Sequence, residues 1–117
     1  MKARWIGFGE IELDGRRYDY DVVIDRGAIA RRRKKPSKAY RDRFGHTPLS
    51  VDEELPLNGA RLVVGTGAYG SLPVMAEVEE EARRRGVELV TAPTEEALRL
   101  LDGAHASEVC AVIHVTC

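Results

Sequence analysis

The chain lacks the features that mark secreted, membrane-spanning and disulfide-stabilised proteins. Its 117 residues include no glutamine, one asparagine, one tryptophan and two cysteines. No apolar run approaches the length that crosses a bilayer, and the opening residues turn polar too early for the core of a signal peptide. Cys110 and Cys117 fall on opposite faces of an expected strand, which disfavours a disulfide between them. We therefore expect a cytoplasmic protein with no membrane partner.

The composition is that of an ordinary globular domain. Hydrophobic residues make up 44% of the chain and charged residues 32%, which is enough apolar surface for one core. No internal repeat or low-complexity linker divides the sequence, so we expect a single domain over residues 1–117. The scarcity of amide side chains beside so many charges resembles the composition of thermophilic proteins.

Positive charge is concentrated in one segment, residues 31–43. This segment holds eight lysine or arginine residues against a single acid, Asp42, although the net charge of the chain is −1. A basic patch of this kind attracts phosphates or nucleic acid, and on an edge strand it also discourages pairing with other chains. No aromatic or glycine repeat interleaves the charges, so nucleic-acid binding through residues 31–43 is the less favoured interpretation.

The first third of the sequence predicts antiparallel strands joined by tight turns. Apolar and polar residues alternate in strand-like stretches at residues 5–13, 18–24 and 28–33. Asp14-Gly15 is typical of a two-residue hairpin turn, in which both residues have positive φ, and Arg26-Gly27 marks a second turn. These elements predict an N-terminal antiparallel meander.

The remaining sequence alternates expected strands and helices. Strands are expected at residues 61–64, 87–90 and 109–115, with one helix beginning near Leu72, Pro73 in its first turn, and a second helix capped by Thr94. This β-α-β-α-β order requires parallel neighbours in the central sheet. The fold class is therefore α/β.

The region between the meander and the second half predicts only short elements. Residues 37–46 are too charged for a core helix and are expected to form a short helix or an ordered loop. Ser50 and Glu53 have the spacing of a capping box, which predicts a short helix that ends before Pro56.

Three glycines, Gly65, Gly67 and Gly70, have the G-x-G-x-x-G spacing of dinucleotide-binding loops. The chain supplies only one half of a dinucleotide fold, however, and no acid follows the next strand. Pro73 also leaves Gly70 outside the following helix, and Gly70-Ser71 lacks the lysine of a phosphate-binding P-loop. We therefore expect a strand-to-helix turn and no nucleotide cofactor.

The same loop is the best candidate for a ligand site. Open α/β sheets bind ligands at the carboxyl ends of their strands, and the backbone amides of residues 66–71 are suited to a carboxylate or a phosphate. The alternative is that the glycines only turn the chain. The candidate ligand-binding residues are Gly65, Thr66, Gly67, Tyr69, Gly70, Ser71, Lys38 and His46.

The sequence shows no constellation of catalytic or metal-binding residues. His46, His105, His114 and Cys117 lack the paired short spacing of zinc ligands. Cys110 lies four residues from His114 along an extended strand, too far for a Cys–His pair. We interpret His114 as a half-buried strand histidine, and we expect no metal, no cofactor and no catalytic residue.

Four stretches of the chain resemble a known family. They are FGEIELDGRRYDYDVVI (8–24), RRRKK (31–35), LVVGTGAYG (62–70) and AVIHVTC (111–117). The resemblance runs over essentially the whole chain and is to the Mth-nine-three-eight-like proteins, a domain of unknown function. Eukaryotic relatives include an adipogenesis-associated protein and a mitochondrial assembly factor for respiratory complex I. The resemblance implies a three-layer α/β fold with a mixed central sheet and an added antiparallel β layer.

The function that these observations favour is a non-enzymatic binding or interaction module, related to assembly, with a small anion-accepting pocket at the glycine loop. Its partner is expected to be a small anionic ligand or another protein, and a homodimer is left open. The first alternative is a small-molecule enzyme that uses His46 or Lys38 beside the glycine loop. The second alternative is nucleic-acid binding through residues 31–43.

Overall fold

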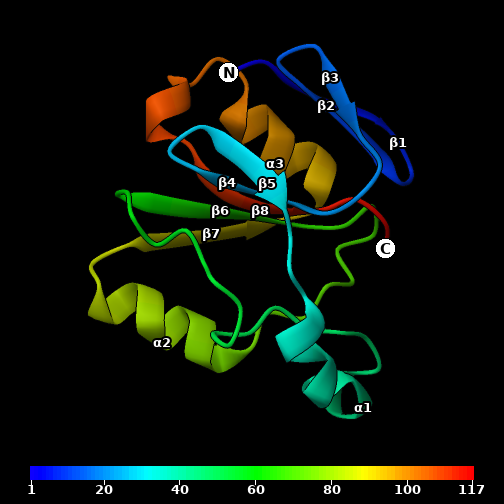
Figure 1. The fold of residues 1–117 in the computed structure, drawn as a ribbon, viewed down its shortest axis with the longest axis vertical. Coiled ribbons are helices and arrows are strands. Elements are labelled where there is room, and N and C mark those ends of the chain that lie inside the picture. Colours follow the sequence, from blue (N-terminus) through cyan, green and yellow to red (C-terminus); the bar gives the residue numbers. More distant parts are fainter.

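The computed structural model describes residues 1–117 as two sheets with helical connections (Figure 1). The strands are β1 (Ala3–Gly7), β2 (Glu10–Leu13), β3 (Arg16–Tyr18), β4 (Val22–Asp25), β5 (Ala28–Arg31), β6 (Arg61–Thr66), β7 (Glu88–Ala92) and β8 (Cys110–His114). The α-helices are α1 (Arg41–Phe44), α2 (Ala76–Arg84) and α3 (Thr94–Leu101), and the 3₁₀ helices are η1 (Lys35–Tyr40) and η2 (Ala106–Glu108).

The larger sheet is mixed, as the family resemblance implies, and it contains the parallel neighbours that the order of elements predicts. Its strand order is β5-β4-β8-β6-β7, and the smaller sheet has the order β1-β2-β3. In the larger sheet β6 runs parallel to both β7 and β8, whereas β4 runs antiparallel to β5 and β8. The predicted α/β class with a mixed central sheet is confirmed.

Two hydrophobic cores lie on opposite faces of the larger sheet. Successive residues of β6 point to opposite faces: Val63 joins the core that includes residues of α3 and the small sheet, and Leu62 and Val64 join the core that includes residues of α2. Figure 1 shows the resulting layers, with α3 and the small sheet on one side of the larger sheet and α2 and α1 on the other.

The N-terminal strands depart from the predicted meander at two points. A turn at Phe8-Gly9, with φ of 84° at Gly9, divides the strand expected over residues 5–13 into β1 and β2. The strand expected over residues 18–24 breaks after Tyr18, and β4 pairs with β8 of the larger sheet. The break places the Asp21 carboxylate at the end of β8, where it accepts a hydrogen bond from the backbone amide of Val115. The meander is therefore shared between the two sheets.

Helix α2 begins later than Pro73 predicts. Its first residue is Ala76, because residues 72–75 stay extended beside Leu49. The Leu49 amide donates to the Pro73 carbonyl, and the Met75 amide donates to the Leu49 carbonyl. These two bonds hold the connection to α2 against the loop that follows α1.

Two predicted helix caps are wrong. No helix forms after Ser50, because the Glu53 carboxylate binds the guanidinium of Arg32 and is not free to cap a helix. Thr94 is the first residue of α3 and makes no capping bond. Its hydroxyl donates to the carbonyl of His114 at 2.5 Å and accepts from the amide of Gly67 at 2.8 Å, so it ties the glycine loop to β8.

The glycine loop after β6 packs directly against the last residues of the chain. The amide of Ala68 donates to the carbonyl of Thr116, and the amides of Tyr69 and Ser71 both donate to the main-chain oxygen of Cys117. Gly67 has φ of 103°, and a Cβ there would lie 2.1 Å from the carbonyl carbon of Cys117. Only glycine allows the two backbones to approach so closely.

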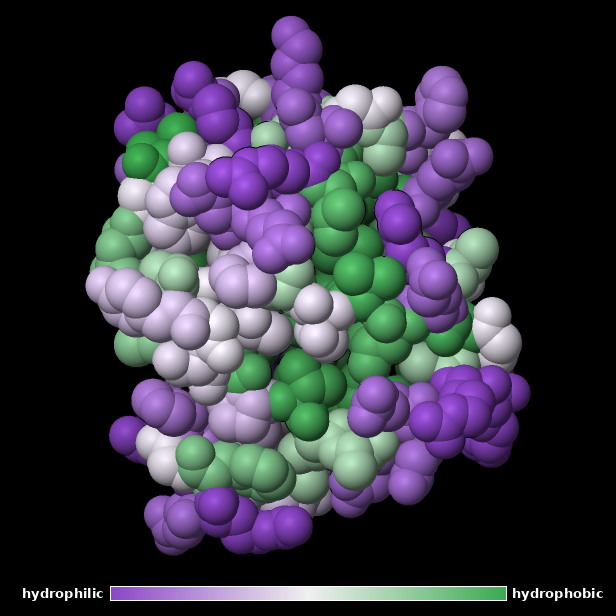
Figure 2. All heavy atoms as spheres, turned by 180° about the vertical axis from the view of Figure 1, so that it is seen from behind, coloured by the Kyte–Doolittle hydropathy of each residue, from purple (hydrophilic) through white to green (hydrophobic).

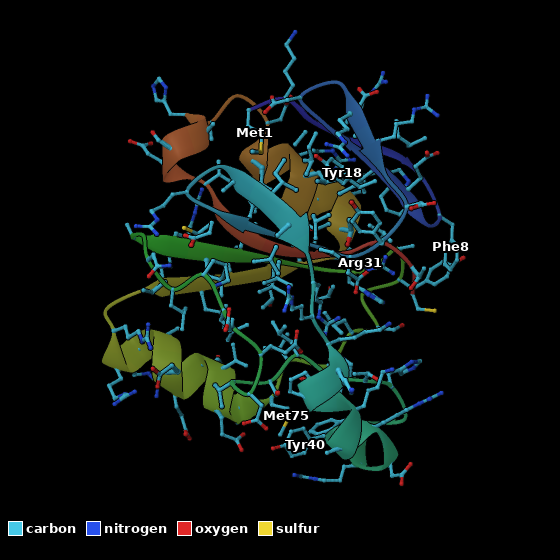
Figure 3. All side chains as sticks on the ribbon, in the orientation of Figure 1. Met1, Phe8, Tyr18, Arg31, Tyr40 and Met75 are labelled. Atoms are coloured by element: carbon cyan, nitrogen blue, oxygen red, sulfur yellow. The ribbon has the colours of Figure 1, made fainter.

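The surface carries one exposed aromatic pair and one apolar band. Phe8 and Tyr69 are 58% and 76% exposed, with ring centroids 6.1 Å apart, and Figure 3 shows Phe8 pointing away from the molecule. On the face opposite to that of Figure 1, hydrophobic residues gather in a band between hydrophilic margins (Figure 2). None of the helices has the length and apolar character required to span a membrane.

The close approach at Gly67 predicts that adding a methyl group there will lower the free energy of unfolding by an unusually large amount. The matched control is Gly103→Ala, because Gly103 also has positive φ, 85°, but has open space where a Cβ would lie. We expect Gly103→Ala to lower the free energy of unfolding by about 1 kcal/mol and Gly67→Ala to lower it by about 3 kcal/mol or more. Urea denaturation measures both, and equal costs would contradict the packing described here.

Candidate functional site

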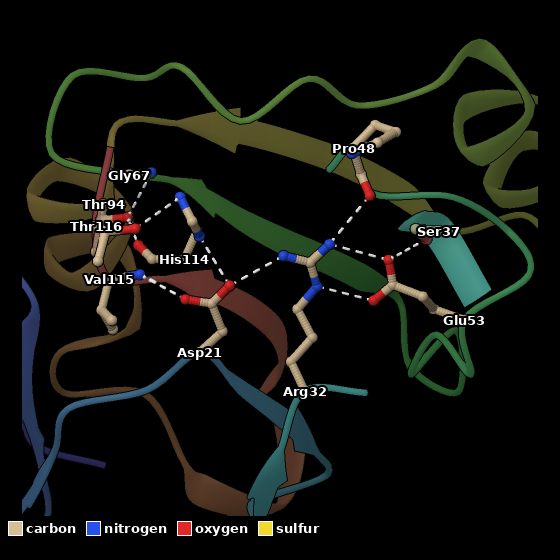
Figure 4. Close-up of polar contacts among 10 residues, drawn as sticks. All are labelled: Asp21, Arg32, Ser37, Pro48, Glu53, Gly67, Thr94, His114, Val115 and Thr116. Atoms are coloured by element: carbon tan, nitrogen blue, oxygen red, sulfur yellow. Dashed lines mark hydrogen bonds and ion pairs between the residues drawn. The ribbon is translucent and has the colours of Figure 1, made fainter. Parts of the chain in front are cut away.

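A buried arginine joins three segments of the chain. Arg32 follows β5, and its side chain is 1% exposed. Its Nε and Nη2 donate to the two carboxylate oxygens of Glu53 at 2.8 and 2.9 Å, and Nη2 also donates to the carbonyl of Pro48 at 3.1 Å. Its Nη1 donates to Oδ2 of Asp21 at 2.9 Å. Figure 4 shows the guanidinium between the two carboxylates.

Each member of this cluster is satisfied by hydrogen bonds. The hydroxyl of Ser37 donates to Oε2 of Glu53 at 2.5 Å and accepts from the hydroxyl of Ser50 at 2.6 Å. Burial lowers the pKa of Arg32, but the hydrogen bonds and charges of Glu53 and Asp21 outweigh it and raise the pKa above its ordinary value. The guanidinium is therefore held in its charged form, and no buried side-chain polar atom lacks a partner.

Asp21 connects the arginine cluster to the last strand. Its Oδ2 also accepts from Nδ1 of His114 at 2.7 Å, and its Oδ1 accepts from the Val115 amide at 3.0 Å. Burial raises the pKa of Asp21, but the hydrogen bond and charge of His114, the Val115 amide and Arg32 outweigh it and hold the pKa below the ordinary value. Asp21 is thus a carboxylate at neutral pH.

A basic pocket lies between the η1–α1 segment and the end of β8. Its volume is about 320 Å³. Its wall contains four lysine or arginine side chains and two imidazoles, and no acidic side chain. The lining residues are Arg32, Lys34, Lys38, Arg41, Gly45, His46, Thr47, Ser71, Leu72, His114, Thr116 and Cys117.

The structure divides the predicted ligand-binding residues among three places. Lys38, His46 and Ser71 lie together on the wall of the basic pocket. Thr66, Tyr69 and Gly70 line a different pocket, of about 610 Å³, beside β7. The two remaining glycines, 65 and 67, line neither pocket and make close backbone and side-chain contacts instead.

The backbone amides of the glycine loop are not free to hold an anion. Gly67 donates to the hydroxyl of Thr94, the amide of Gly70 donates to the carbonyl of Gly67, and the amides of residues 68, 69 and 71 donate to the last two residues of the chain. The expectation that these amides cradle a ligand is therefore wrong. An anion in the basic pocket would therefore not be held by the amides of residues 67–71.

Sequence reasoning missed most of the polar side chains behind the pocket. The charge run at 31–35 does not distinguish Arg32 from its exposed neighbours, and nothing in the sequence pairs it with Asp21 or Glu53. One signal was present: His114 and Thr116 are two residues apart in an expected strand and so share a face. The structure brings Nε2 of His114 to 3.2 Å from the Thr116 hydroxyl.

The depressed pKa of Asp21 predicts how stability changes with pH. Its carboxylate stabilises the fold fully above the ordinary pKa of 3.8, and this contribution is lost as the pH falls through the lower folded value. We expect Asp21→Asn to lower the free energy of unfolding by about 3 kcal/mol at neutral pH. The deficit should shrink as the pH is lowered below the ordinary pKa, because the wild-type carboxyl then becomes neutral too.

Denaturant unfolding at a series of pH values measures this difference. The matched control is Asp19→Asn, because Asp19 is exposed and two residues away. The control should have the same free energy of unfolding as the wild type at every pH. A deficit of Asp21→Asn that stayed constant down to the lowest pH would contradict the proposed role of the carboxylate.

The comparisons with known proteins identify a family of uncharacterised function. Neither a protein-family model nor a curated protein matches the chain. Among solved structures, the chain is similar to the conserved hypothetical protein PH1505 from Pyrococcus horikoshii OT3, with 34% identity over 100% of both chains and a TM-score of 0.79.

A second solved structure supports the fold. It is called MT938, and it matches 99% of this chain and 100% of its own with 23% identity and a TM-score of 0.70. Full-length similarity at 34% identity, together with this shared fold, shows that the chain belongs to the Mth-nine-three-eight-like family.

Proposed function

We propose that this domain is a binding module that holds a small phosphorylated or carboxylated ligand in the basic pocket. The observation that carries the proposal is the charge of the side chains on the pocket wall: Lys34, Lys38 and Arg41 converge there, and no lining residue has an acidic side chain. A concave site lined by one sign of charge concentrates ligands of the opposite sign. The volume, about 320 Å³, suits a small molecule.

The three exposed cations contribute charge that the protein does not neutralise. Arg32, in contrast, is already paired with Asp21 and Glu53. No salt bridge involves Lys34, Lys38 or Arg41. A bound anion would therefore meet groups whose charge is available. Charge-assisted hydrogen bonds from lysine and arginine to phosphate or carboxylate are among the stronger polar contacts in proteins.

The glycine loop forms part of the opposite wall. Ser71 lines the pocket, as do Thr116 and Cys117, whose carbonyls accept the amide hydrogen bonds of the loop. The loop thus holds the C-terminal segment in place on this wall. The cations within residues 34–41 would supply the affinity for the anion.

The arrangement of the basic segment favours a small ligand over a nucleic-acid strand. Nucleic-acid surfaces present a stripe of cations that follows the backbone of the ligand. Here one arginine of the segment is buried, and three cations are gathered around one concavity. The assembly role remains a prediction, for which the exposed pair Phe8 and Tyr69 is the surface best suited to a protein partner.

An enzymatic function of the pocket is the alternative that the geometry also supports. Lys38 and His46 line the same pocket as the loop residue Ser71. Both side chains are exposed to the incoming ligand, so either one is placed to exchange a proton with it.

Binding of inorganic phosphate and pyrophosphate tests the proposal directly. We expect both anions to raise the melting temperature of the wild type, with an affinity that falls as salt is added. The double variant Lys38→Ala/Arg41→Ala should bind at least about tenfold more weakly, because it loses two charge-assisted contacts. Isothermal titration calorimetry measures the affinity at constant ionic strength.

The matched control is the double variant Lys35→Ala/Arg43→Ala. It removes the same charge from the same segment, but neither residue lines the pocket. The control should bind like the wild type. Equal weakening of the two double variants would show a diffuse effect of net charge, and no binding by the wild type at millimolar anion would overturn the proposal.

A further inference from the structure

A chain of three side chains ends on the wall of the basic pocket. Asp21 binds Nδ1 of His114 at 2.7 Å, and Nε2 of the same ring lies 3.2 Å from the hydroxyl of Thr116. Both His114 and Thr116 line the pocket. Figure 4 shows the imidazole between the carboxylate and the hydroxyl.

The hydrogen-bond partners fix the direction of this chain. Asp21 is a carboxylate, so Nδ1 of His114 must be the donor to it. In the neutral ring Nε2 is then an acceptor, and the Thr116 hydroxyl donates to it. The oxygen of that hydroxyl keeps its lone pairs for a ligand in the pocket. A hydroxyl, an imidazole and a carboxylate connected in this order are the signature of an activated nucleophile.

We propose that this pocket transfers phosphoryl groups, with Thr116 as the nucleophile, His114 as its general base and Asp21 as the residue that orients the imidazole. The inference rests on the proposed anion-binding function, because the substrate must be held by the same cations. Its substrate class is a phosphate monoester. Lys34, Lys38 and Arg41 are placed to neutralise the oxygens of the phosphoryl group, which is the main demand of this reaction.

The reaction proceeds in two balanced steps. Oγ1 of Thr116 attacks phosphorus while its proton moves to Nε2 of His114, a P–O bond to Oγ1 forms, and the alcohol leaves as an alkoxide with the electrons of the broken P–O bond. Water then attacks the phosphothreonine, the bond to Oγ1 breaks, and the His114 imidazolium returns its proton to Oγ1. The products are dihydrogen phosphate and the alkoxide, which takes a proton from the solvent.

The surrounding structure keeps the three side chains aligned. Asp21 is held on its other sides by the Val115 amide and by Arg32. The ring of His114 packs beneath Gly67, where a Cβ would lie 2.9 Å from Cδ2 of the ring. The His114 carbonyl is bound by the Thr94 hydroxyl. A fixed base within hydrogen-bond reach of its nucleophile is what general-base catalysis requires.

Hydrolysis of p-nitrophenyl phosphate by the full chain tests this inference. We expect the wild type to release nitrophenolate faster than buffer alone. Thr116→Val has the same shape without the hydroxyl, and its rate of hydrolysis should be at least about 100-fold lower than that of the wild type. Thr116→Ser should retain most of the rate because it keeps the nucleophile. Thr91→Val is the matched control, because Thr91 is an exposed threonine of β7 outside the basic pocket, and its rate should equal that of the wild type.

A covalent label gives a second readout that a structural role of Thr116 would not produce. Protein quenched in acid during turnover should carry one phosphoryl group, which fragmentation mass spectrometry should place on Thr116 and which should be absent from the Thr116→Val variant. A phosphoryl group on His114 would overturn the assignment of the nucleophile.

The remaining outcomes separate the inference from the proposed function. If the wild type binds inorganic phosphate but neither hydrolyses the ester nor acquires a label, the transfer activity is overturned and the binding function stands. If the wild type binds no phosphate and shows no turnover, both are overturned. Equal rates for the wild type and Thr116→Val would also overturn the proposed nucleophile.

Discussion

The buried ion pairs of Arg32 are the interaction on which the rest of the site depends. One guanidinium links the end of β5 to Asp21 before β4, to Glu53 and to the Pro48 carbonyl. Charges buried to this degree are tolerated only when they are paired and fully hydrogen-bonded, and removing one partner leaves the others uncompensated. The cluster therefore fixes where η1 and α1 lie against the larger sheet, and with them the exposed cations of the basic pocket.

The glycine loop supplies the second constraint, through steric fit. Positive φ at Gly67 and the absence of a side chain there allow the loop to lie on the main chain of Cys117, and the amides of the loop bind the two C-terminal residues. The feature that resembles a dinucleotide fingerprint thus has a structural use within the chain. It holds Thr116 and the ring of His114 against the pocket, opposite the basic segment.

Much of the fold could be predicted, because it follows from local signals. Asp14-Gly15 formed the expected hairpin turn, and the strand–helix order of the second half led to the parallel pairing of β6 with β7 and β8. The site was less predictable because it depends on contacts between distant residues. Lys38 and His46 could be predicted as polar groups near the glycine loop. The hydrogen bonds between Arg32 and Glu53 could not, because the local sequence around Glu53 predicts a capping box.

The central claim is that the Arg32 cluster shapes a pocket whose exposed cations bind an anion. A crystal structure determined with inorganic phosphate tests it most directly. The account predicts phosphate oxygens within hydrogen-bond distance of Lys38 and Arg41, with Arg32 still paired to Asp21 and Glu53 behind them. Phosphate found only elsewhere on the surface, or an Arg32 side chain turned out of its cluster to meet the anion, would contradict the account.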